Sequence, residues 1–565
     1  MMKIVIVGGV AGGATAATRL RRLSEENEVI IFEKGPYVSF ANCGLPYHIS
    51  GTISNRNSLL LQTPEKLKER YNLDARVFSE VLSINTLEKI VMVKNLQTGN
   101  TYAESYDKLL LSPGAEPIRP PFEGINSDKI FTLRNIPDMD KIVAKTKEAN
   151  DFVVVGGGFI GLEVAENLIE AGKNVQLVEL GNQVMAPVDF EIASFIHQKA
   201  AEKGLKFLLN TGVQKFADKG NKIEVFFTNG TSVETDAVIL SIGVKPDTQL
   251  AKNAGLEIGT TGGILVNEYL QTTHPDIYAV GDAVEVAHFI HHKKVLIPLA
   301  WPANRQGRIV ADNILMGNSY KYSGSLGSSI LKFFELTVAS TGLNEKFLKR
   351  NKIPYKTAVV TRGHHAGYYP GAKTMVLKLL FDETGKIFGA QAVGEKGVDK
   401  RIDVIATAIK GGLSIYDLQE IEITYAPPFN SAKDIVNIAG YTAENMLNGK
   451  LEMINYDELA TYAEENNATI LDVRTAEEFA CGNIPEAVNI SVDDLRANIH
   501  QLDRSKTYVI YCQVGLRGYL ATRILNNHGF KAVNLNGGYQ IWAKVFPKAT
   551  LLQECVVMSS VDAMA

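Results

Sequence analysis

Apolar and polar positions repeat in the same order in two parts of the chain. In the first part, a predicted buried strand, Lys3–Val7, runs into a glycine-rich turn and a helical segment, and a second strand ends at Glu33. In the second part, the strand Phe152–Val155 is followed by the same succession, which ends at Glu179. The glycines of the two turns are Gly8, Gly9, Gly12 and Gly13, then Gly156, Gly157, Gly158 and Gly161. This order predicts two βαβ units.

Each unit has the composition of a dinucleotide-binding site. Glycines in the turn let the backbone approach a pyrophosphate, the helix N-terminus supplies N–H donors, and the acid binds ribose hydroxyls. The second turn matches G-x-G-x-x-G in full, whereas Val10 replaces the middle glycine of the first. Two such sites predict electron transfer between two carriers, most simply a bound flavin and a nicotinamide. Glu179 favours NADH because its carboxylate would repel a 2′-phosphate, although NADPH stays open.

Short apolar strands and a turn-rich linker divide the rest of the chain. Apolar strands run into Gly114, Gly243 and Gly281, and after about residue 325 the strands and helices lack glycine fingerprints. Asn448–Lys450 marks a linker, and a new unit starts near Tyr456. We predict an α/β protein whose parts are a first Rossmann-like nucleotide domain at 1–118 and 247–324, a second at 119–246, an α+β domain at 325–447, a linker at 448–455, a C-terminal α/β module at 456–547 and a tail at 548–565.

The composition restricts the class of protein. The chain has 565 residues, of which 58 are Lys or Arg and 62 are Asp or Glu, so its formal net charge is −4. This balance disfavours a nucleic-acid-binding protein. Four cysteines are too few for a disulfide scaffold, and no apolar run reaches the ~20 residues that a membrane span needs. We expect a soluble, cytoplasmic enzyme without nucleic-acid or membrane partners, and we assign no residue to a metal.

The two-site architecture resembles the flavoprotein disulfide reductases, in which the first site holds FAD and the inserted second site holds NAD(P)H. Thr273–Asp282 (THPDIYAVGD) is similar to the second FAD motif of that family, whose aspartate binds the ribityl chain. The cofactor-binding positions that this resemblance implies are Gly8, Gly9, Gly12, Gly13, Glu33, Lys34, Gly114, Asp282, Gly156, Gly158, Gly161, Glu179 and Gly243.

Cys43 is the candidate redox residue. It lies shortly after Glu33, which places it near the flavin of the first unit, and His48 stands where dithiol members of the family have their second cysteine. Cys43 must therefore act alone, as a thiolate that forms a mixed disulfide, a persulfide or a sulfenic acid. Lowering its pKa from about 8.5 to about 6 would raise the thiolate fraction at pH 7 from roughly 3% to roughly 90%.

Within that family the chain resembles the coenzyme A-disulfide reductases, through Gly8–Gly13 (GGVAGG) and Ser39–Tyr47 (SFANCGLPY). The resemblance implies that coenzyme A lies along the first helix. Thr15, Arg19 and Arg22 share one face of that helix, because they are spaced by four and three residues, and arginines suit phosphate groups. Further substrate contacts implied are Ser39, Asn42 and Lys433, while Asn304 stands where the subfamily has a substrate-binding histidine.

The same resemblance implies a homodimer whose active sites are shared between subunits. The chain lacks the C-terminal His–Glu base of the dithiol enzymes, so tyrosines of the partner subunit would protonate the leaving thiolate. Tyr425 matches one of these tyrosines and Tyr368 matches the other. Tyr369 is the alternative to Tyr368 if the match is shifted by one residue. A phenol with a pKa of about 10 suits donation to a departing thiolate with a pKa of about 8.5.

The C-terminal module resembles a single-domain rhodanese over its whole length. The motifs are Leu471–Arg474 (LDVR), Cys481–Ile490 (CGNIPEAVNI), Tyr511–Gly518 (YCQVGLRG) and Leu535–Trp542 (LNGGYQIW). The loop from Cys512 to Arg517 lies between a predicted strand and a helix, where backbone N–H groups can stabilise a cysteine persulfide. Arg517 is interpreted as an anion clamp or as a support of the loop.

These features predict an FAD-dependent NAD(P)H reductase of CoA persulfide, polysulfide or CoA disulfide, with Cys512 handling sulfane sulfur. One alternative is CoA-disulfide reduction as the main role. A second is an NADH oxidase or peroxidase that cycles Cys43 through a sulfenic acid. The coenzyme A-like helix face and the rhodanese-like module count against the second alternative.

Overall fold

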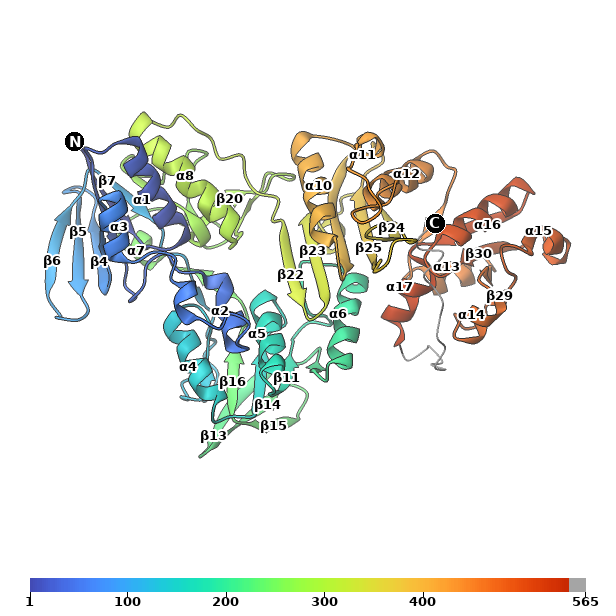
Figure 1. Cartoon of the computed structure of the whole chain (residues 1–565), viewed down its shortest axis with the longest axis horizontal. Helices are drawn as coiled ribbons and strands as arrows, with labels where there is room; N and C mark the ends of the chain where they lie inside the picture. Colours follow the sequence, from blue (N-terminus) through green and yellow to red (C-terminus); the bar gives the residue numbers. More distant parts are fainter. Residues whose placement is uncertain (548–565) are drawn as a thin grey trace. The chain divides into compact units, whose positions relative to one another are not determined.

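The computed structural model describes residues 1–547, so the predicted tail at 548–565 lies outside the described residues. The chain forms two compact units (Figure 1). The first comprises Met1–Val184 and Gly204–Gly327, and the second comprises Met185–Lys203 and the chain from Ser328 onward. A segment of the predicted second nucleotide domain, Met185–Lys203, therefore packs within the second unit.

A parallel five-stranded sheet forms the centre of the first nucleotide domain. Ile4, Val5 and Ile6 in its middle strand have no exposed surface, because parallel strands covered on both faces need a continuous apolar run. In order across the sheet, the strands are β19 (Ile277–Ala279), β7 (Lys108–Leu111), β1 (Lys3–Val7), β2 (Glu28–Phe32) and β3 (Asp74–Arg76). Helix α1 (Ala11–Leu23) packs against α8 (Ala300–Met316).

A second parallel sheet repeats this arrangement in the second nucleotide domain. Its strands, in the corresponding order, are β9 (Ile130–Phe131), β16 (Ala237–Leu240), β10 (Asp151–Val155), β11 (Asn174–Val178) and β12 (Lys206–Leu208). Each domain also contains a three-stranded antiparallel sheet. These sheets are β4 (Ser79–Asn85), β5 (Ile90–Asn95) and β6 (Thr101–Ser105), and β13 (Val213–Lys219), β14 (Lys222–Phe227) and β15 (Ser232–Thr235). The internal repeat therefore extends beyond the glycine turns.

Shorter elements complete the first unit. Its other helices are α2 (Leu45–Ile49), α3 (Pro64–Tyr71), α4 (Ile136–Thr146), α5 (Phe159–Glu170) and α7 (Gln249–Asn253). Its short strands are β8 (Ala115–Pro117), β17 (Val244–Pro246), β18 (Ile264–Leu265), β20 (Val284–Ala287) and β21 (Lys294–Val295).

An antiparallel five-stranded sheet forms the α+β domain of the second unit. Across the sheet the strands are β22 (Ser329–Phe333), β23 (Leu336–Gly342), β26 (Ile387–Gly394), β25 (Thr374–Phe381) and β24 (Lys356–Gly363), so β24 is an edge strand. The helices of this part are α6 (Phe190–Glu202), α9 (Glu345–Arg350), α10 (Val398–Gly411), α11 (Ile415–Glu420) and α12 (Ile435–Leu447). The inner strands β25 and β26 are buried almost throughout, which makes the one lysine among them, Lys378, conspicuous.

The C-terminal module has a parallel sheet of its own. Its strands in order are β27 (Met453–Ile454), β31 (Lys531–Leu535), β30 (Thr507–Tyr511), β28 (Thr469–Asp472) and β29 (Val488–Asn489). Its helices are α13 (Leu459–Glu465), α14 (Ala476–Ala480), α15 (Leu495–Asn498), α16 (Leu516–Asn527) and α17 (Gly538–Val545). The carboxyl end of the central strand β30 leads directly to Cys512.

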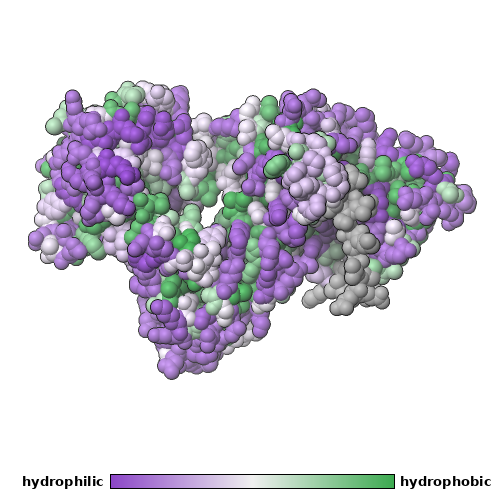
Figure 2. Space-filling view, viewed as in Figure 1, coloured by the Kyte–Doolittle hydropathy of each residue, from purple (hydrophilic) through white to green (hydrophobic). Residues whose placement is uncertain are grey.

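Hydrophilic residues dominate the face of the molecule seen in Figure 2, with hydrophobic residues in smaller groups between them. Within residues 1–547, none of the helices has the length and apolar character that crossing a bilayer requires.

Candidate active sites

The turn after β1 is built so closely that only glycine fits at two positions. Gly8 has φ +97°, and a Cβ there would lie 2.1 Å from the carbonyl oxygen of Ser112. A Cβ on Gly13 would lie 1.9 Å from the carbonyl oxygen of Gly8. These contacts bring helix α1 against the strands, so that its N-terminus faces the carboxyl edge of the sheet.

The Glu33 carboxylate ties that turn to the end of β2. It accepts hydrogen bonds from the backbone N–H groups of Gly9 (2.9 Å) and Gly35 (2.8 Å). A cavity of about 490 Å³ opens beside it and is lined by Gly8, Gly12, Glu33, Lys34, Gly114 and Asp282, among others. Burial raises the pKa of Asp282, and the charge of Arg134 opposes that rise. This cavity joins most of the positions predicted to bind FAD.

The second turn repeats the same bonds. Glu179 accepts from the N–H groups of Gly157 (2.7 Å) and Gly181 (2.8 Å). Gly156 has φ +104°, and a Cβ on Gly161 would lie 1.9 Å from its carbonyl oxygen. The space in front of Gly158, the N-cap of α5, is open. This is the position where the fingerprint requires backbone to approach a pyrophosphate, so the residues fit a dinucleotide here as well.

Cys43 lies in a single 3₁₀ turn, Asn42–Gly44, and its side chain is exposed. Desolvation by the surrounding atoms nevertheless raises the pKa of the thiol, and the carboxylates of Glu163 and Asp282 raise it further. The protein groups around Cys43 therefore do not lower the pKa of its thiol, because burial and two negative charges all raise it. Asp282 belongs to the predicted FAD motif, and Glu163 belongs to helix α5 of the second glycine fingerprint, so residues of both predicted nucleotide sites act on this sulfur.

Glu163 is a site residue that the motifs did not reveal. Burial, and then the neighbouring charge of Glu166, raise the pKa of Glu163 to about 7. The hydroxyl of Tyr47 donates a hydrogen bond to it at 3.5 Å, and helix α2 packs against α5 at this point. A sequence signal exists, because a glutamate two residues after Gly161 must lie near the start of the fingerprint helix. That signal does not say which side chains face it.

The predicted coenzyme A face of α1 is partly engaged by other side chains. Thr15 donates to the Oδ1 atom of Asn304 at 2.6 Å. Arg19 binds the carboxylate of Asp312 through Nε (3.0 Å) and Nη2 (2.8 Å). Arg22 is exposed and has no such partner within the described residues. Of the two predicted phosphate contacts, Arg22 is therefore the one with an unengaged guanidinium.

Ser39 and Asn42 lie on the segment that carries Cys43. Ser39 has φ +47°, and its N–H bonds to the carbonyl oxygen of Gly9 at 2.8 Å. This bond joins the cysteine segment to the glycine turn, and Asn42 is exposed beside Cys43. The local backbone thus keeps the predicted substrate contacts next to the predicted FAD cradle.

Tyr368 and Tyr425 form a pair in the second unit. Their hydroxyl oxygens are 2.8 Å apart, and the side chains are 76% and 47% exposed. Tyr369 instead packs edge-on against His365, at 5.5 Å between ring centroids, so Tyr368 is the residue that shares a hydrogen bond with Tyr425. That bond raises the pKa of Tyr368. Phe429 is also exposed nearby in sequence, as is Lys433.

Cys512 follows strand β30 and is only 1% exposed. Its Sγ atom accepts a hydrogen bond from the backbone N–H of Gly515 at 3.1 Å. Gly515 has φ +113° and directly precedes helix α16. The sulfur therefore lies at a helix N-terminus with an N–H group directed at it, an arrangement that stabilises an anion on sulfur.

Arg517 supports the loop by an ion pair. Its Nη1 and Nη2 atoms bind the two carboxylate oxygens of Glu478 at 2.7 and 2.8 Å. Glu478 also completes a capping box with Thr475 at the start of α14. This ion pair joins the end of the Cys512 loop to helix α14.

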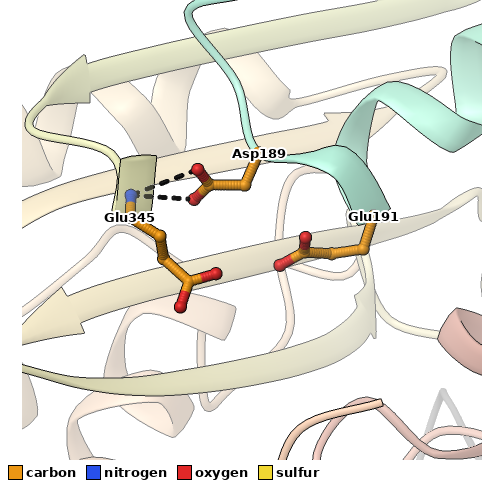
Figure 3. Close-up of side chains that lie close together, drawn as sticks. All are labelled: Asp189, Glu191 and Glu345. Carbon is orange, nitrogen blue, oxygen red and sulfur yellow. Dashed lines mark hydrogen bonds between the residues drawn. The ribbon is translucent and has the colours of Figure 1, made fainter. Parts of the chain in front are cut away.

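Three carboxylates in the second unit converge, as Figure 3 shows for Asp189, Glu191 and Glu345. The ammonium group of Lys378 lies among them, 3.0 Å from Asp189 and in hydrogen bonds with Glu191 and Glu345. Burial opposes the charge on Lys378, but the carboxylates raise its pKa well above the usual value. The lysine supplies the positive charge of this cluster, which joins α6, α9 and β25.

Comparison with known proteins places these features in a family. Residues 2–307 match the model for pyridine nucleotide-disulphide oxidoreductases, residues 328–435 match the dimerisation domain of that family, and residues 455–545 match the rhodanese-like domain. The chain belongs to the pyridine nucleotide-disulphide oxidoreductase family, with a fused rhodanese-like domain. The family implies FAD and a pyridine nucleotide as cofactors, and the two glycine cradles fit both.

Three relatives bring the comparison closer. The coenzyme A disulfide reductase of Staphylococcus aureus is 39% identical over 448 residues, which are 79% of this chain and all of that protein. The structure of reduced CoADR-RHD from Bacillus anthracis has a TM-score of 0.95 at 49% identity, covering 97% of this chain and 99% of that one. An NAD-dependent persulfide reductase from A. fulgidus has a TM-score of 0.91 at 35% identity, covering 96% and 100%.

Proposed function

We propose that this chain is an FAD-dependent NADH reductase of coenzyme A persulfide, polysulfide and coenzyme A disulfide, with Cys43 as its single redox cysteine. The observation that carries the proposal is the exposed thiol of Cys43, close enough to Asp282 and Glu163 for both carboxylates to raise its pKa. One carboxylate comes from the FAD motif and the other from the nicotinamide-site helix. The names of the relatives, a coenzyme A disulfide reductase and a persulfide reductase, support this substrate class.

When bound, FAD and NADH together supply two electrons as a hydride equivalent to the sulfur held at Cys43. The Cys43 thiolate attacks the outer sulfur of CoA–S–SH, so that Cys43–S–SH forms and the CoA thiolate leaves. Two electrons then restore the Cys43 thiolate and release sulfide. The balance is CoA–SSH + NADH → CoA–SH + HS⁻ + NAD⁺, and for the disulfide it is CoA–SS–CoA + NADH + H⁺ → 2 CoA–SH + NAD⁺.

The leaving CoA thiolate needs a proton. We propose that Tyr425 or Tyr368 of the partner subunit in a homodimer donates this proton. The match to a dimerisation domain at 328–435 supports the dimer. The hydroxyl–hydroxyl hydrogen bond of 2.8 Å lets one phenol replace the proton that the other gives up. Exposed Arg22 is the phosphate contact on α1, with Thr15, Ser39, Asn42 and Lys433 as further substrate contacts.

The glutamate at the second nucleotide site supports NADH over NADPH. Both Glu179 oxygens already accept backbone N–H bonds from the turn, so the carboxylate is fixed where a 2′-phosphate would have to lie. A higher kcat/KM with NADH than with NADPH is expected in steady-state assays on one preparation. The opposite ratio would contradict this assignment.

The rhodanese-like domain supports a substrate that carries sulfane sulfur. We propose that Cys512 holds this sulfur as a persulfide, and that the long pantetheine arm of coenzyme A carries it from Cys512 to Cys43. Cys512→Ser should then leave reduction of CoA disulfide unchanged and slow the reduction of polysulfide. An unchanged polysulfide rate would contradict the transfer.

The central experiment compares anaerobic NADH oxidation with coenzyme A persulfide and with coenzyme A disulfide, using Cys43→Ser as the blank. Faster turnover of the persulfide, with sulfide release, supports a persulfide reductase of sulfur metabolism. Faster turnover of the disulfide supports a coenzyme A redox enzyme with an accessory rhodanese-like domain. If neither rate exceeds that of Cys43→Ser, the coenzyme A assignment is wrong, and oxygen and peroxide become the substrates to test.

A further inference from the structure

Asn536 takes the place of a neighbouring strand at the edge of the antiparallel sheet. It follows β31 of the rhodanese-like domain and is 2% exposed. Its Oδ1 atom accepts from the N–H of Val359 (2.9 Å), and its Nδ2 atom donates to the carbonyl oxygen of Thr357 (3.0 Å). Both partners lie on the edge strand β24. A parallel strand would bond the C=O and N–H of residues two apart in this way.

A second side chain strengthens this junction. Gln540 lies four residues after Asn536, and its Oε1 atom accepts a hydrogen bond from the hydroxyl of Thr361, also on β24, at 3.1 Å. The Asn536 Nδ2 atom bonds in addition to the Thr357 hydroxyl (3.2 Å) and to Asn455 Oδ1 (2.9 Å). The segment 536–540 is therefore held to β24 at both of its ends.

The middle of the same segment holds the Cys512 loop. The N–H of Tyr539 donates to the carbonyl oxygen of Cys512 (2.8 Å), and the N–H of Gln540 donates to that of Gln513 (2.9 Å). These N–H groups belong to the first turn of α17, where a helix leaves its donors without intrahelical partners. The carbonyls of the first two peptide bonds of the loop are thus bonded to a segment that is itself bonded to β24.

Two glycines allow this close approach. A Cβ on Gly538 would lie 2.5 Å from the carbonyl oxygen of Cys512, and one on Gly537 would lie 2.3 Å from Ile541 and 3.2 Å from Val359. Both residues have positive φ, +75° at Gly537 and +62° at Gly538. The backbone here is shaped to touch the Cys512 loop on one side and β24 on the other.

We propose that Asn536 and Gln540 are positioning residues for Cys512, and that the edge strand β24 of the dimerisation domain is thereby part of the support of the sulfur-transfer loop. This inference rests on the sulfur-transfer role proposed above for Cys512. The loop directs the Gly515 N–H at the sulfur. Releasing the Cys512 and Gln513 carbonyls would free the first residues of this loop, so the sulfur and the Gly515 N–H at the other end of the loop would no longer be held in register.

The reaction that reports on the loop can be written with simple probes. The Cys512 thiolate takes the outer sulfur of thiosulfate, which forms Cys512–S–S⁻ and releases sulfite. Cyanide then takes that sulfur and leaves as thiocyanate, which restores the thiolate. Each step breaks one sulfur–sulfur bond, and no electrons enter or leave the protein overall.

The test uses the full chain with Asn536→Ala and, as a milder change outside the rhodanese-like domain, Thr357→Val. The matched control is Asn526→Ala, because Asn526 also bonds a backbone C=O and N–H, those of Ala532 on β31, without reaching β24. We expect Asn536→Ala to lower thiocyanate formation by about 10-fold or more, since small misplacements of reacting groups have effects of this size. Thr357→Val should lower the rate of thiocyanate formation by less, and Thr357→Ser, which keeps the hydroxyl, should have the wild-type rate. The control Asn526→Ala should also stay near the wild-type rate.

A second readout does not depend on activity. Amide hydrogen exchange at Tyr539 and Gln540 should become about 10-fold faster in Asn536→Ala and remain unchanged in Asn526→Ala. Unchanged exchange in Asn536→Ala, or equal activity losses in both variants, would overturn the positioning role. If exchange accelerates as expected but wild type makes no more thiocyanate than Cys512→Ser, the sulfur-transfer role is wrong while the support by β24 stands. NADH oxidation with coenzyme A disulfide checks that the flavoprotein part is intact.

Discussion

Arg517 and Glu478 form an ion pair with two hydrogen bonds of 2.7 and 2.8 Å, which joins the end of the Cys512 loop to helix α14. Both side chains are largely buried. These two bonds account for two of the five N–H donors of the Arg517 guanidinium. We expect this pair to hold the Cys512 loop in place.

Glu478→Ala should destabilise the rhodanese-like domain by about 2 kcal/mol, the size expected for charge-assisted hydrogen bonds, and slow thiocyanate formation. Urea unfolding and the sulfur-transfer assay measure the two effects. Burial opposes ionisation of Glu478, but the bonds from Arg517 and from Thr475 N–H lower its pKa overall. The contribution of ionised Glu478 to the free energy of unfolding is therefore complete above the pKa of glutamate in the unfolded chain. It is lost as the pH falls through the lower pKa of Glu478 in the folded chain. Glu477→Ala, on the exposed side of the same helix, is the control, and an equal effect there would refute the role.

The Tyr368–Tyr425 bond predicts a change in pH dependence. Because the bond raises the pKa of Tyr368, Tyr425→Phe should lower that pKa and shift the alkaline limb of the kcat profile for CoA-disulfide reduction to lower pH. Loss of a general acid should also reduce kcat by about 10-fold or more. Tyr369→Phe is the matched control. A profile displaced equally by Tyr369→Phe would show that the hydrogen-bonded pair is not the proton source.

The charge near Cys43 can be changed at Glu163. Since the Glu163 carboxylate raises the pKa of the Cys43 thiol, Glu163→Gln should lower it and make alkylation of Cys43 by iodoacetamide faster at pH 7. The rate is followed on the Cys43 peptide by mass spectrometry between pH 6 and 9. Glu170→Gln, on the exposed far end of α5, should leave the profile in place. A shift of the midpoint to higher pH in Glu163→Gln would contradict the electrostatic argument.

Lys378→Met should be among the more destabilising single substitutions in the dimerisation domain. It leaves Asp189, Glu191 and Glu345 facing one another without the buried ammonium, which is expected to cost about 3–5 kcal/mol. Thermal unfolding measures the loss, and adding Glu191→Gln should recover part of it by removing one repelling charge. Lys373→Met breaks an exposed pair with Glu395 and should change stability by about 1 kcal/mol or less. Equal losses for the two lysines would refute this account.

The features that sequence predicted well are those with a local cause. A run such as Ile4–Ile6 followed by Gly8 and Gly13 carries its own steric reason, since a Cβ at either glycine would meet backbone atoms. The same holds for Cys512, whose strand, loop and helix are consecutive in the chain. Local order along the chain was enough to find both glycine cradles and both candidate redox cysteines.

The features that sequence missed depend on residues far apart in the chain. Arg19 meets Asp312 across 293 positions and Asn536 meets Val359 across 177, and no periodicity reports such pairs. The pKa of Cys43 is raised by burial and by two carboxylates from other segments of the chain, and no local pattern reports either cause.

The sequence by itself determined the βαβ repeats, the glycine turns and the positions of the cysteines. The reason is that steric contacts in a turn and the period of hydrophobic positions both involve residues only a few positions apart in the chain. Only the tertiary structure decided which charges surround Cys43, which arginine of α1 is already paired, and that Asn536 joins the Cys512 loop to β24. Electrostatic fields and side-chain hydrogen bonds act through space, so they are known only when distant segments have been brought together.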